Sequence, residues 1–470
     1  DGTNPIEVTV EFWAKTTDAN LTSADAGGDM RLKVKDEVSS VVKFNRVLLT
    51  TGSWVYITTT FTFDAAADYS LSLFFEFGIV DGITQIDGIK TSVSGGATLA
   101  SDSITWDGST DNDWNTTTNW TPERVPTETE KAIIPVVSTN YPTSGSAVDI
   151  NSVTMANGSS LISTSTFSGN ITYTRSLATT NWYLVSSPVN NQDINVFTTR
   201  EGLASSGTNI GLSQGYNTGD DTWTYYQSDA SGSGSFVTGK GYAIKLASEG
   251  DIYFEGTIRN TDVTRTLAIS ANAYNLVANP YTSYMDTAAM LTANTGVLGT
   301  ETIWVWNSST GSYDTKVTAD AYKLAPAQGF FVKSDGQAGD LALNQAYEVH
   351  NASDTFQRTE PRPEIHLTLS DGPLSRLAKI YYINGTTTGF DNGYDGEMFG
   401  GISNEFAIYS HLVSNESVID LAVQSLPTNN YENMVIPLGI NAAAEEQLSI
   451  SANAINLPEG VNIYLEDKND

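Results

Sequence analysis

The sequence has no cysteine and only three histidines, and its acidic residues far outnumber its basic ones. Without cysteine there are no disulfides, thiolate metal ligands or cysteine nucleophiles. Lys and Arg number 23 against 54 Asp and Glu, which gives a formal net charge of −31. The electrostatic field of a protein with this negative net charge repels nucleic acids and anionic membranes. We therefore expect no nucleic-acid partner.

Long hydrophobic runs are missing as well. The longest, LSLFFEFGIV at residues 71–80, is too short to cross a bilayer and contains Glu76. We therefore expect no transmembrane segment. Because Asp1 is not a translation start, we expect a piece of a longer, processed chain. The absence of cysteine, with abundant Thr, Ser, Asn and Gly, favours an extracellular bacterial surface protein over a cytosolic one.

Period-two alternation is abundant, whereas helical periodicity is nearly absent. Apolar residues recur at alternate positions in residues 6–12, 55–63 and 71–77. This pattern is typical of antiparallel strands with one buried face. The sequence therefore predicts an all-β fold of tandem β-sandwich or jelly-roll domains. Residues 147–175, rich in Ser and Thr, predict a short β-solenoid-like module or a small sandwich.

Two polar segments indicate domain boundaries. SVSGGATLASDS (92–103) has the composition of a linker, and TFQRTEPRPEIH (355–366) combines two prolines with clustered charge. The predicted units are a jelly-roll at 1–96, a Trp-rich small β module at 104–175, β repeat units at 176–265 and 266–355, and a C-terminal β-sandwich at 362–470.

An internal repeat supports the two middle units. WYLVSSPV (182–189) resembles YNLVANPY (274–281), YNTGDDTW (216–223) resembles WNSSTGSY (306–313), and GKGYAIK (239–245) resembles AQGFFVK (327–333). The landmarks keep their order, which indicates duplication of a β unit of normal module size. The paired positions, 92, 90 and 88 residues apart, are Leu184 and Leu276, Asn217 and Asn307, and Gly241 and Gly329.

Six motifs follow one another along residues 182–333: WYLVSSPV, GKGYAI, FEGT, NLVANPY, IWVWN and APAQGFFVK. Before them stands WDGSTDNDWNTTTNWTPERVP (106–126), and after them GFDNGYDGEMFGG, IPLGI and LPEGVNIYLED. In this order, over residues 106–470, the chain resembles large surface proteins that Bacteroidetes export through the type IX secretion system. The resemblance implies the export machinery as a partner, and a C-terminal sorting domain that this chain lacks.

The first 95 residues carry VTVEFWAK (8–15), TTGSWVYITTTFTF (50–63) and GITQIDGIK (82–90). In these segments the chain resembles jelly-roll carbohydrate-binding modules of families 4 and 9. The resemblance implies a jelly-roll whose usual first strand would precede Asp1. It also implies a polysaccharide or surface glycan as the partner.

Outward-facing aromatic rings are the candidate sugar-binding residues. Flat rings stack on the C–H faces of sugars, while polar neighbours bond the hydroxyls. The alternative is that a neighbouring domain covers this sheet face. We expect Trp54 to be structural, because it opens a strand. The predicted binding residues, placed on one face by the alternation, are Trp13, Tyr56, Phe74, Glu11 and Glu76.

Calcium is the candidate cofactor, because Ca²⁺ takes six to eight oxygen ligands. DNGYDGE offers Asp391, Asp395 and Glu397 in a Gly-rich turn, and Asp87 matches the acid of the IDG segment. DGSTDND (107–113) offers three more acids. The alternative for each is a polar turn held by Asx hydrogen bonds.

Two segments, DSI at Ser103 and DTA at Thr287, resemble the O-glycosylation signal of Bacteroidetes secreted proteins. Neither bears on catalysis, and we expect no enzyme. GLSQG places Ser213 in a G-x-S-x-G pattern, but no helical pattern follows it as a nucleophile elbow requires. No pair of carboxylates is distinguished as a glycosidase pair.

Three tryptophans crowd the stretch from Trp106 through Trp114 to Trp120. Their spacing among turn residues favours a buried structural clasp over a sugar platform. Three hypotheses for function stay open. The first is a non-enzymatic surface protein for adhesion or extracellular assembly, with a glycan-binding N-terminal module. The others are an accessory region of a polysaccharide-degrading enzyme and a self-assembling fibre or sheath subunit.

Overall fold

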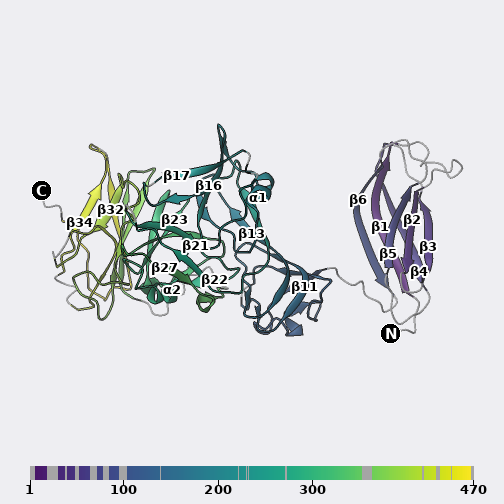
Figure 1. Ribbon diagram of the computed structural model, residues 1–470, viewed down its shortest axis with the longest axis horizontal. Helices are drawn as coiled ribbons and strands as arrows, with labels where there is room; N and C mark the ends of the chain where they lie inside the picture. The colour runs from purple at the N-terminus through teal and green to yellow at the C-terminus, as the bar shows by residue number, and fades with distance from the viewer. Residues whose placement is uncertain are drawn as a thin grey trace. The chain divides into compact units, whose positions relative to one another are not determined.

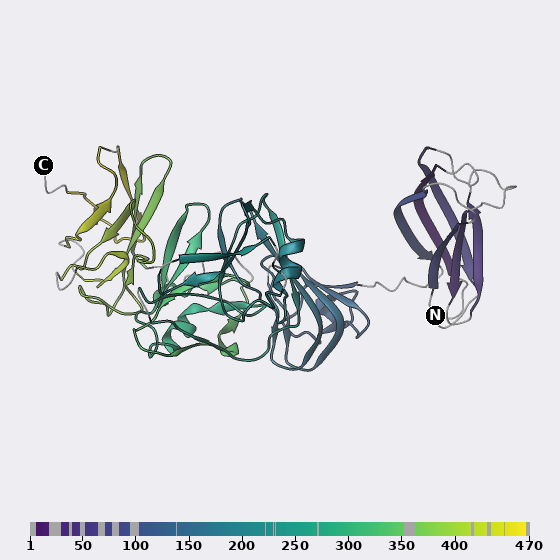
Figure 2. The ribbon, with the colours of Figure 1, turned by 45° about the horizontal axis from the view of Figure 1, so that its top comes forward.

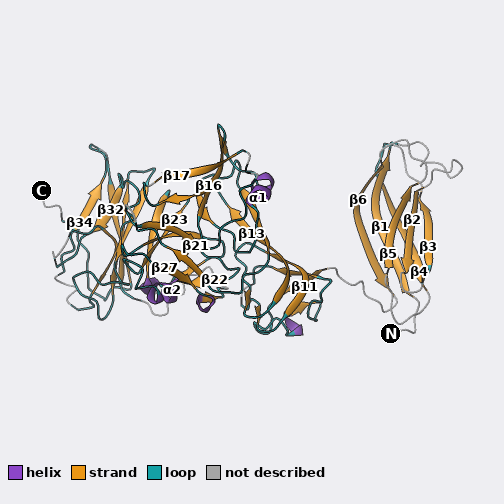
Figure 3. Cartoon of the chain, in the orientation of Figure 1, coloured by secondary structure: helices purple, strands orange, loops and turns teal. Residues whose placement is uncertain are grey.

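The computed structural model describes residues 6–17, 30–36, 40–47, 52–63, 71–77, 84–94, 103–351 without 138, 221, 229, 231, 270 and 271, and 362–466 without 415–417, 430–433 and 446. Within these residues it confirms the predicted all-β, multi-domain fold, with two short α-helices among many sheets (Figure 3). The chain divides into two compact units, Asp1–Asp102 and Ser103–Asp470. None of the helices in the described part of the chain is long and apolar enough to span a membrane.

The first unit is a sandwich of two three-stranded antiparallel sheets, ordered β4-β1-β6 and β3-β2-β5 (Figure 1). Val8, Val10 and Phe12 of one sheet pack against Leu32 and Val34 of the other. The alternation seen in the sequence therefore sorts an inner from an outer face on each sheet. The strands are β1 (Ile6–Thr16), β2 (Met30–Asp36), β3 (Val42–Val47), β4 (Val55–Phe63), β5 (Leu71–Phe77) and β6 (Thr84–Ser94).

The second unit begins with parallel strands stacked like coils of a solenoid (Figure 2). The neighbours β7, β9, β11 and β13 run parallel, and the short pair β10 and β12 is parallel too. β19, which lies within the predicted repeat unit 176–265, pairs antiparallel with β13 and extends this sheet. The strands are β7 (Ser103–Trp106), β8 (Trp120–Thr121), β9 (Lys131–Ile134), β10 (Thr143–Ser144), β11 (Val148–Met155), β12 (Ile162–Ser163), β13 (Phe167–Leu177) and β19 (Gly250–Gly256).

The three clustered tryptophans form the predicted buried clasp. Trp106, Trp114 and Trp120 are at most 1% exposed. Trp120 meets Trp106 and Trp114 edge to face, with ring centroids 4.9 and 4.7 Å apart. Its indole N–H donates to the carbonyl of Trp114 at 2.8 Å. The three acids between them each accept the backbone N–H two residues further on, at 2.9–3.0 Å, so the Asx-turn alternative describes this segment: Asp107, Asp111 and Asp113.

The two repeats have the same strand topology. The first forms the order β14-β18-β16-β17 and the second β21-β26-β23-β24. Leu184 lies opposite Ala243 in the first, and Leu276 lies opposite Phe331 in the second. These are the register positions that the sequence landmarks pair, so the two segments share strand order and register, as a duplication requires. The strands are β14 (Tyr183–Val185), β16 (Asn209–Asn217), β17 (Thr222–Gln227), β18 (Tyr242–Ile244), β21 (Tyr274–Ala278), β23 (Thr302–Asn307), β24 (Ser312–Val317) and β26 (Gly329–Lys333).

Each repeat also carries one short helix after its first strand. α1 (Ile194–Arg200) is N-capped by Asp193, and α2 (Thr287–Ala293) is N-capped by Asp286. Each cap carboxylate accepts backbone N–H groups of the first turn. Smaller strands complete the repeats: β15 (Ser205–Ser206), β20 (Val263–Thr266), β22 (Tyr284–Asp286), β25 (Lys323–Leu324), β27 (Asp340–Leu343) and β28 (Glu348–Val349).

The repeats face each other through a reciprocal contact. Val185 bridges Gln328, and the equivalent Val277 bridges Lys240. Gly329 lies so close to Leu184 that a Cβ on the glycine would come within 2.9 Å of the leucine Cβ. At the equivalent place, a Cβ on Gly241 would come within 2.6 Å of the Leu276 side chain. The two copies therefore meet as in an isologous dimer, with the same patch used twice.

A polar cluster joins the Trp-rich module to the second repeat. The His350 ring nitrogens lie 2.9 Å from the Thr143 hydroxyl and 2.8 Å from the Ser160 hydroxyl. Burial lowers the pKa of His350 to about 4. Nearby in sequence, burial raises the pKa of Glu348 to about 7, although Ser283 donates to its carboxylate at 2.6 Å.

These two groups predict opposite pH slopes. The unfolded chain protonates His350 near pH 6.5 and the folded chain only near 4, so its contribution to stability is lost as pH falls through that window. Glu348 keeps its proton up to about pH 7 when folded, so its contribution is lost as pH rises from about 4.5 to 7. The free energy of unfolding of wild type minus that of His350→Gln should therefore grow from pH 4 to 6.5. The same difference for Glu348→Gln should shrink from pH 4.5 to 7. Denaturant titrations at several pH values measure both, and parallel pH profiles for all three proteins would contradict the prediction.

In the C-terminal segment, which the sequence predicts to be a β-sandwich and which we call the C-terminal sandwich, the described strands form one mixed sheet. Its order is β34-β32-β33-β30-β29-β35, with β31 on β33. It packs on the second repeat through Val317, Tyr381 and Val423. Arg362 reinforces this contact, because its guanidinium lies 3.5 Å from the Tyr381 ring centroid and 2.9 Å from Asp320. The strands are β29 (Glu364–Ser370), β30 (Ser375–Tyr382), β31 (Gly396–Glu397), β32 (Ala407–Ser410), β33 (Leu421–Leu426), β34 (Leu438–Asn441) and β35 (Ser449–Ile455).

Candidate functional site

The outer face of the β4-β1-β6 sheet carries two adjacent exposed rings. Trp13 on β1 and Tyr56 on β4 are direct cross-strand partners. Their ring centroids lie 5.0 Å apart with the planes tilted by 48°. Trp13 is 46% and Tyr56 48% exposed. The structure therefore brings two of the three predicted aromatic residues together on a solvent-facing surface.

Polar groups surround this pair of rings. Glu11 lies on the same face of β1 as Trp13, and its hydrogen bond with the Tyr56 hydroxyl raises the pKa of that hydroxyl. Asp87 on β6 pairs with Trp13 from the other side, is exposed, and accepts the N–H of Gly88 at 2.7 Å. Predicted as a calcium ligand, Asp87 thus lies beside the predicted sugar-binding residues.

Two further residues, Trp54 and Lys15, lie on this face and were not among the predicted binding residues. Trp54, which we expected to be structural, is 42% exposed. The Lys15 ammonium lies 4.7 Å from the centroid of its ring. Both residues stand two positions from a predicted ring, Trp54 from Tyr56 and Lys15 from Trp13. Because residues two apart on a strand share a face, the period-two pattern could have identified them.

Phe74 lies elsewhere, which corrects the prediction that all three rings share one face. It stands on β5 of the other sheet, where it is 39% exposed and has the Lys33 ammonium 4.8 Å from its ring centroid. Alternation separates inside from outside but does not tell which of two sheets a strand joins. Glu76 lies on the same strand, and its side chain is outside the described residues.

The acidic turn before β31 uses its carboxylates for internal bonds. Asp395 is fully buried, and its carboxylate accepts the backbone N–H groups of Asp391 and of Ser425 in β33. Burial raises the pKa of this carboxyl group to about 7. Glu397 forms an ion pair with Lys333 at 2.7 Å. Asp391 accepts both the N–H and the hydroxyl of Thr387. Throughout the described ranges, no three His, Asp or Glu side chains form a group that could hold a metal ion. Calcium binding stays a prediction.

The two predicted glycosylation residues have different surroundings. Ser103 opens β7 and is partly exposed. Thr287 opens α2, is fully buried, and donates its hydroxyl to the carbonyl of Tyr322 at 2.8 Å. Ser213 of the G-x-S-x-G pattern is also buried, within β16, where its hydroxyl accepts the N–H of Ala243 at 2.8 Å. A strand interior is not a nucleophile elbow.

Residues 150–470 match the family described as a domain of unknown function, DUF8693. The match covers more than half of the chain, so the chain belongs to this family. No curated protein and no solved structure matches the chain. The matched segment begins within β11 and includes both repeats and the C-terminal sandwich, whereas the face that carries Trp13 lies before it.

Proposed function

We propose that this member of the DUF8693 family is a non-enzymatic surface protein whose first unit binds a glycan. The proposal rests on the adjacent exposed rings of Trp13 and Tyr56, which share their sheet face with acidic residues and Lys15. Two large exposed rings present apolar area to water, and a partner that covers them removes this area from water, which favours binding. A pyranose ring offers C–H faces for stacking and hydroxyls for the flanking polar groups.

The polar neighbours favour a hydroxyl-rich ligand over an apolar one. The carboxylates of Glu11 and Asp87 accept hydrogen bonds from sugar hydroxyls. The Tyr56 hydroxyl and the Lys15 ammonium supply donors. Since Glu11 and Asp87 both lie beside Trp13, a neutral glycan meets less repulsion at this face than an anionic one.

The proposal extends to location. A cysteine-free chain, rich in β-sheet and resembling type IX exported proteins, is suited to display on a bacterial cell surface, for adhesion or extracellular assembly. Protease treatment of intact cells that express the full-length gene tests this point. Cleavage of the protein on intact cells is expected, and cleavage only after lysis would contradict surface display.

A glycan array tests the binding function. Wild type should bind at least one class of neutral glycan in buffer with calcium. Trp13→Ala should weaken that binding about tenfold or more, since truncating a central tryptophan removes a dominant contact. Val136→Ala, at an exposed apolar residue in the second unit, is the control and should bind as wild type does. Absence of any bound glycan, or equal binding by Trp13→Ala, would overturn the proposal.

A further inference from the structure

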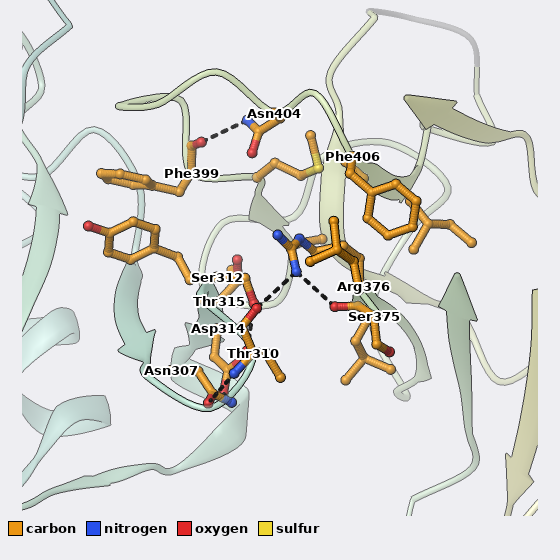
Figure 4. A pocket seen from close by; sticks show the side chains of 18 of the residues that line it. Asn307, Thr310, Ser312, Asp314, Thr315, Ser375, Arg376, Phe399, Asn404 and Phe406 are labelled. Atoms are coloured by element: carbon orange, nitrogen blue, oxygen red, sulfur yellow. Dashed lines mark hydrogen bonds between the residues drawn. The ribbon is translucent and has the colours of Figure 1, made fainter. Parts of the chain in front are cut away.

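A cavity of about 600 Å³ lies between the second repeat and the C-terminal sandwich. Its walls are the hairpin between β23 and β24, the first half of β30, and the loop 398–406 (Figure 4). Pockets of this size accommodate ligands as large as a disaccharide. The cavity belongs to the second unit and has no residue in common with the aromatic face of the first.

Arg376 stands in the middle of the cavity (Figure 4). One guanidinium nitrogen, Nη1, donates to the carbonyls of Thr310 at 3.1 Å and Ser375 at 2.9 Å. These bonds fix the plane of the guanidinium and leave its other edge directed at the cavity. Arginine presents such an edge to a carboxylate as a two-pronged fork.

Among the described residues, no carboxylate oxygen lies within 4.0 Å of an Arg376 guanidinium nitrogen. Two acidic residues, Asp314 and Glu405, line the same cavity outside that distance. Burial lowers the pKa of Arg376, and Asp371 acts on it only from a distance. Lys379 also lines the cavity, and burial lowers its pKa, while the charges of Asp320 and Asp314 act in the opposite direction. A partly desolvated, unpaired cation costs free energy that a bound anion would offset.

The rest of the lining suits a sugar. Asn404 donates its amide to the carbonyl of Phe399 at 3.0 Å, and its oxygen faces the cavity (Figure 4). Thr310 and Ser312 contribute hydroxyls, 2.8 Å from each other. The Phe406 ring, 5.8 Å from the Arg376 guanidinium, supplies a flat apolar wall. Exposed apolar side chains surround the opening: Leu374, Leu377 and Ile402.

We propose that this cavity binds an oligosaccharide that contains a uronic acid, with its carboxylate on the free edge of Arg376. The sugar ring lies against Phe406, and its hydroxyls bond Asn404, Thr310 and Ser312. The repeat supplies the hydroxyls and the sandwich supplies the cation, so the site exists only where these two parts of the second unit meet.

Isothermal titration of the 470-residue chain with digalacturonate tests the proposal, and the fully methyl-esterified disaccharide is the neutral comparison. Wild type should bind the acid at least ten times more tightly than the ester. Arg376→Gln should lose about tenfold or more of the affinity for the acid, because a charge-assisted hydrogen bond is removed. Arg376→Lys keeps the charge without the fork and should lie between the two.

Two variants serve as controls. Arg175→Gln removes an arginine that does not line the cavity, and Trp13→Ala disables the face of the first unit; both should bind digalacturonate as wild type does. Circular dichroism establishes that Arg376→Gln is folded, and if it is not, Arg376→Lys decides. No binding by wild type, equal affinity for acid and ester, acetate binding as tight as the disaccharide, or unchanged affinity in the folded Arg376 variant would each overturn the proposal.

Discussion

Trp120→Ala is expected to lower the free energy of unfolding of the second unit by about 3–5 kcal/mol, the usual cost of deleting a fully buried tryptophan. Trp120 has no exposed surface and is held between Trp106 and Trp114. Its removal leaves a cavity lined by two rings and deprives the Trp114 carbonyl of its donor. Because Trp120 lies in the same buried cluster as residues of β11, β13 and the first repeat, the loss should affect the second unit as a whole.

Differential scanning calorimetry measures this effect, since the unfolding transition of the second unit should shift to lower temperature. Trp120→Phe keeps an aromatic ring and loses the indole N–H, so it should cost less. Tyr394→Ala is the control within the second unit, because Tyr394 is 43% exposed and its truncation leaves no cavity. If Trp120→Ala lowered the unfolding temperature of the second unit no more than Tyr394→Ala does, the buried-clasp interpretation would be contradicted.

Gly329→Ala should destabilise the pair of repeats by about 1–3 kcal/mol, the typical cost of overpacking. The new Cβ would stand 2.9 Å from the Cβ and 3.0 Å from the carbonyl carbon of Leu184. Because the Leu184 backbone cannot move without shifting β14, the two repeats must separate. Gly241→Ala makes the reciprocal contact with Leu276 and should have a similar effect.

Equilibrium unfolding in guanidinium chloride measures the free energy of unfolding of the second unit and so checks this prediction. Gly296→Ala, in the same repeat, is the control, because its Cβ would meet nothing within 4 Å. This control should be close to neutral or slightly stabilising, as the unfolded chain loses freedom. If Gly329→Ala and Gly296→Ala gave the same free energy of unfolding, the close contact between the repeats would be contradicted.

Local patterns predicted much of this architecture. The alternation at Val8, Val10 and Phe12 identified an inner face, and the repeated landmarks at Leu184 and Leu276 identified two copies with the same register. The spacing of the tryptophans among turn residues indicated a buried clasp. Each of these signals lies within a few residues of sequence or in a direct repetition, which is why sequence alone could reveal it.

Long-range pairing is what sequence could not provide. Nothing local tells that Phe74 belongs to the sheet opposite Trp13, or that β19 joins β13. The cavity around Arg376 needs a carbonyl from Thr310, 66 residues earlier in the chain. Such sites arise where separate segments pack together, and single-sequence patterns carry no information about that packing.

The most direct test of the central claim, that a glycan binds the outer face of the β4-β1-β6 sheet, is a calorimetric titration with the tightest neutral glycan from the array. Trp13→Ala and Phe74→Ala are compared, since each truncates an exposed ring, one on either outer face of the same sandwich. Trp13→Ala should weaken binding about tenfold or more, while Phe74→Ala should leave it unchanged. Loss of binding in Phe74→Ala with wild-type affinity in Trp13→Ala would contradict the central claim.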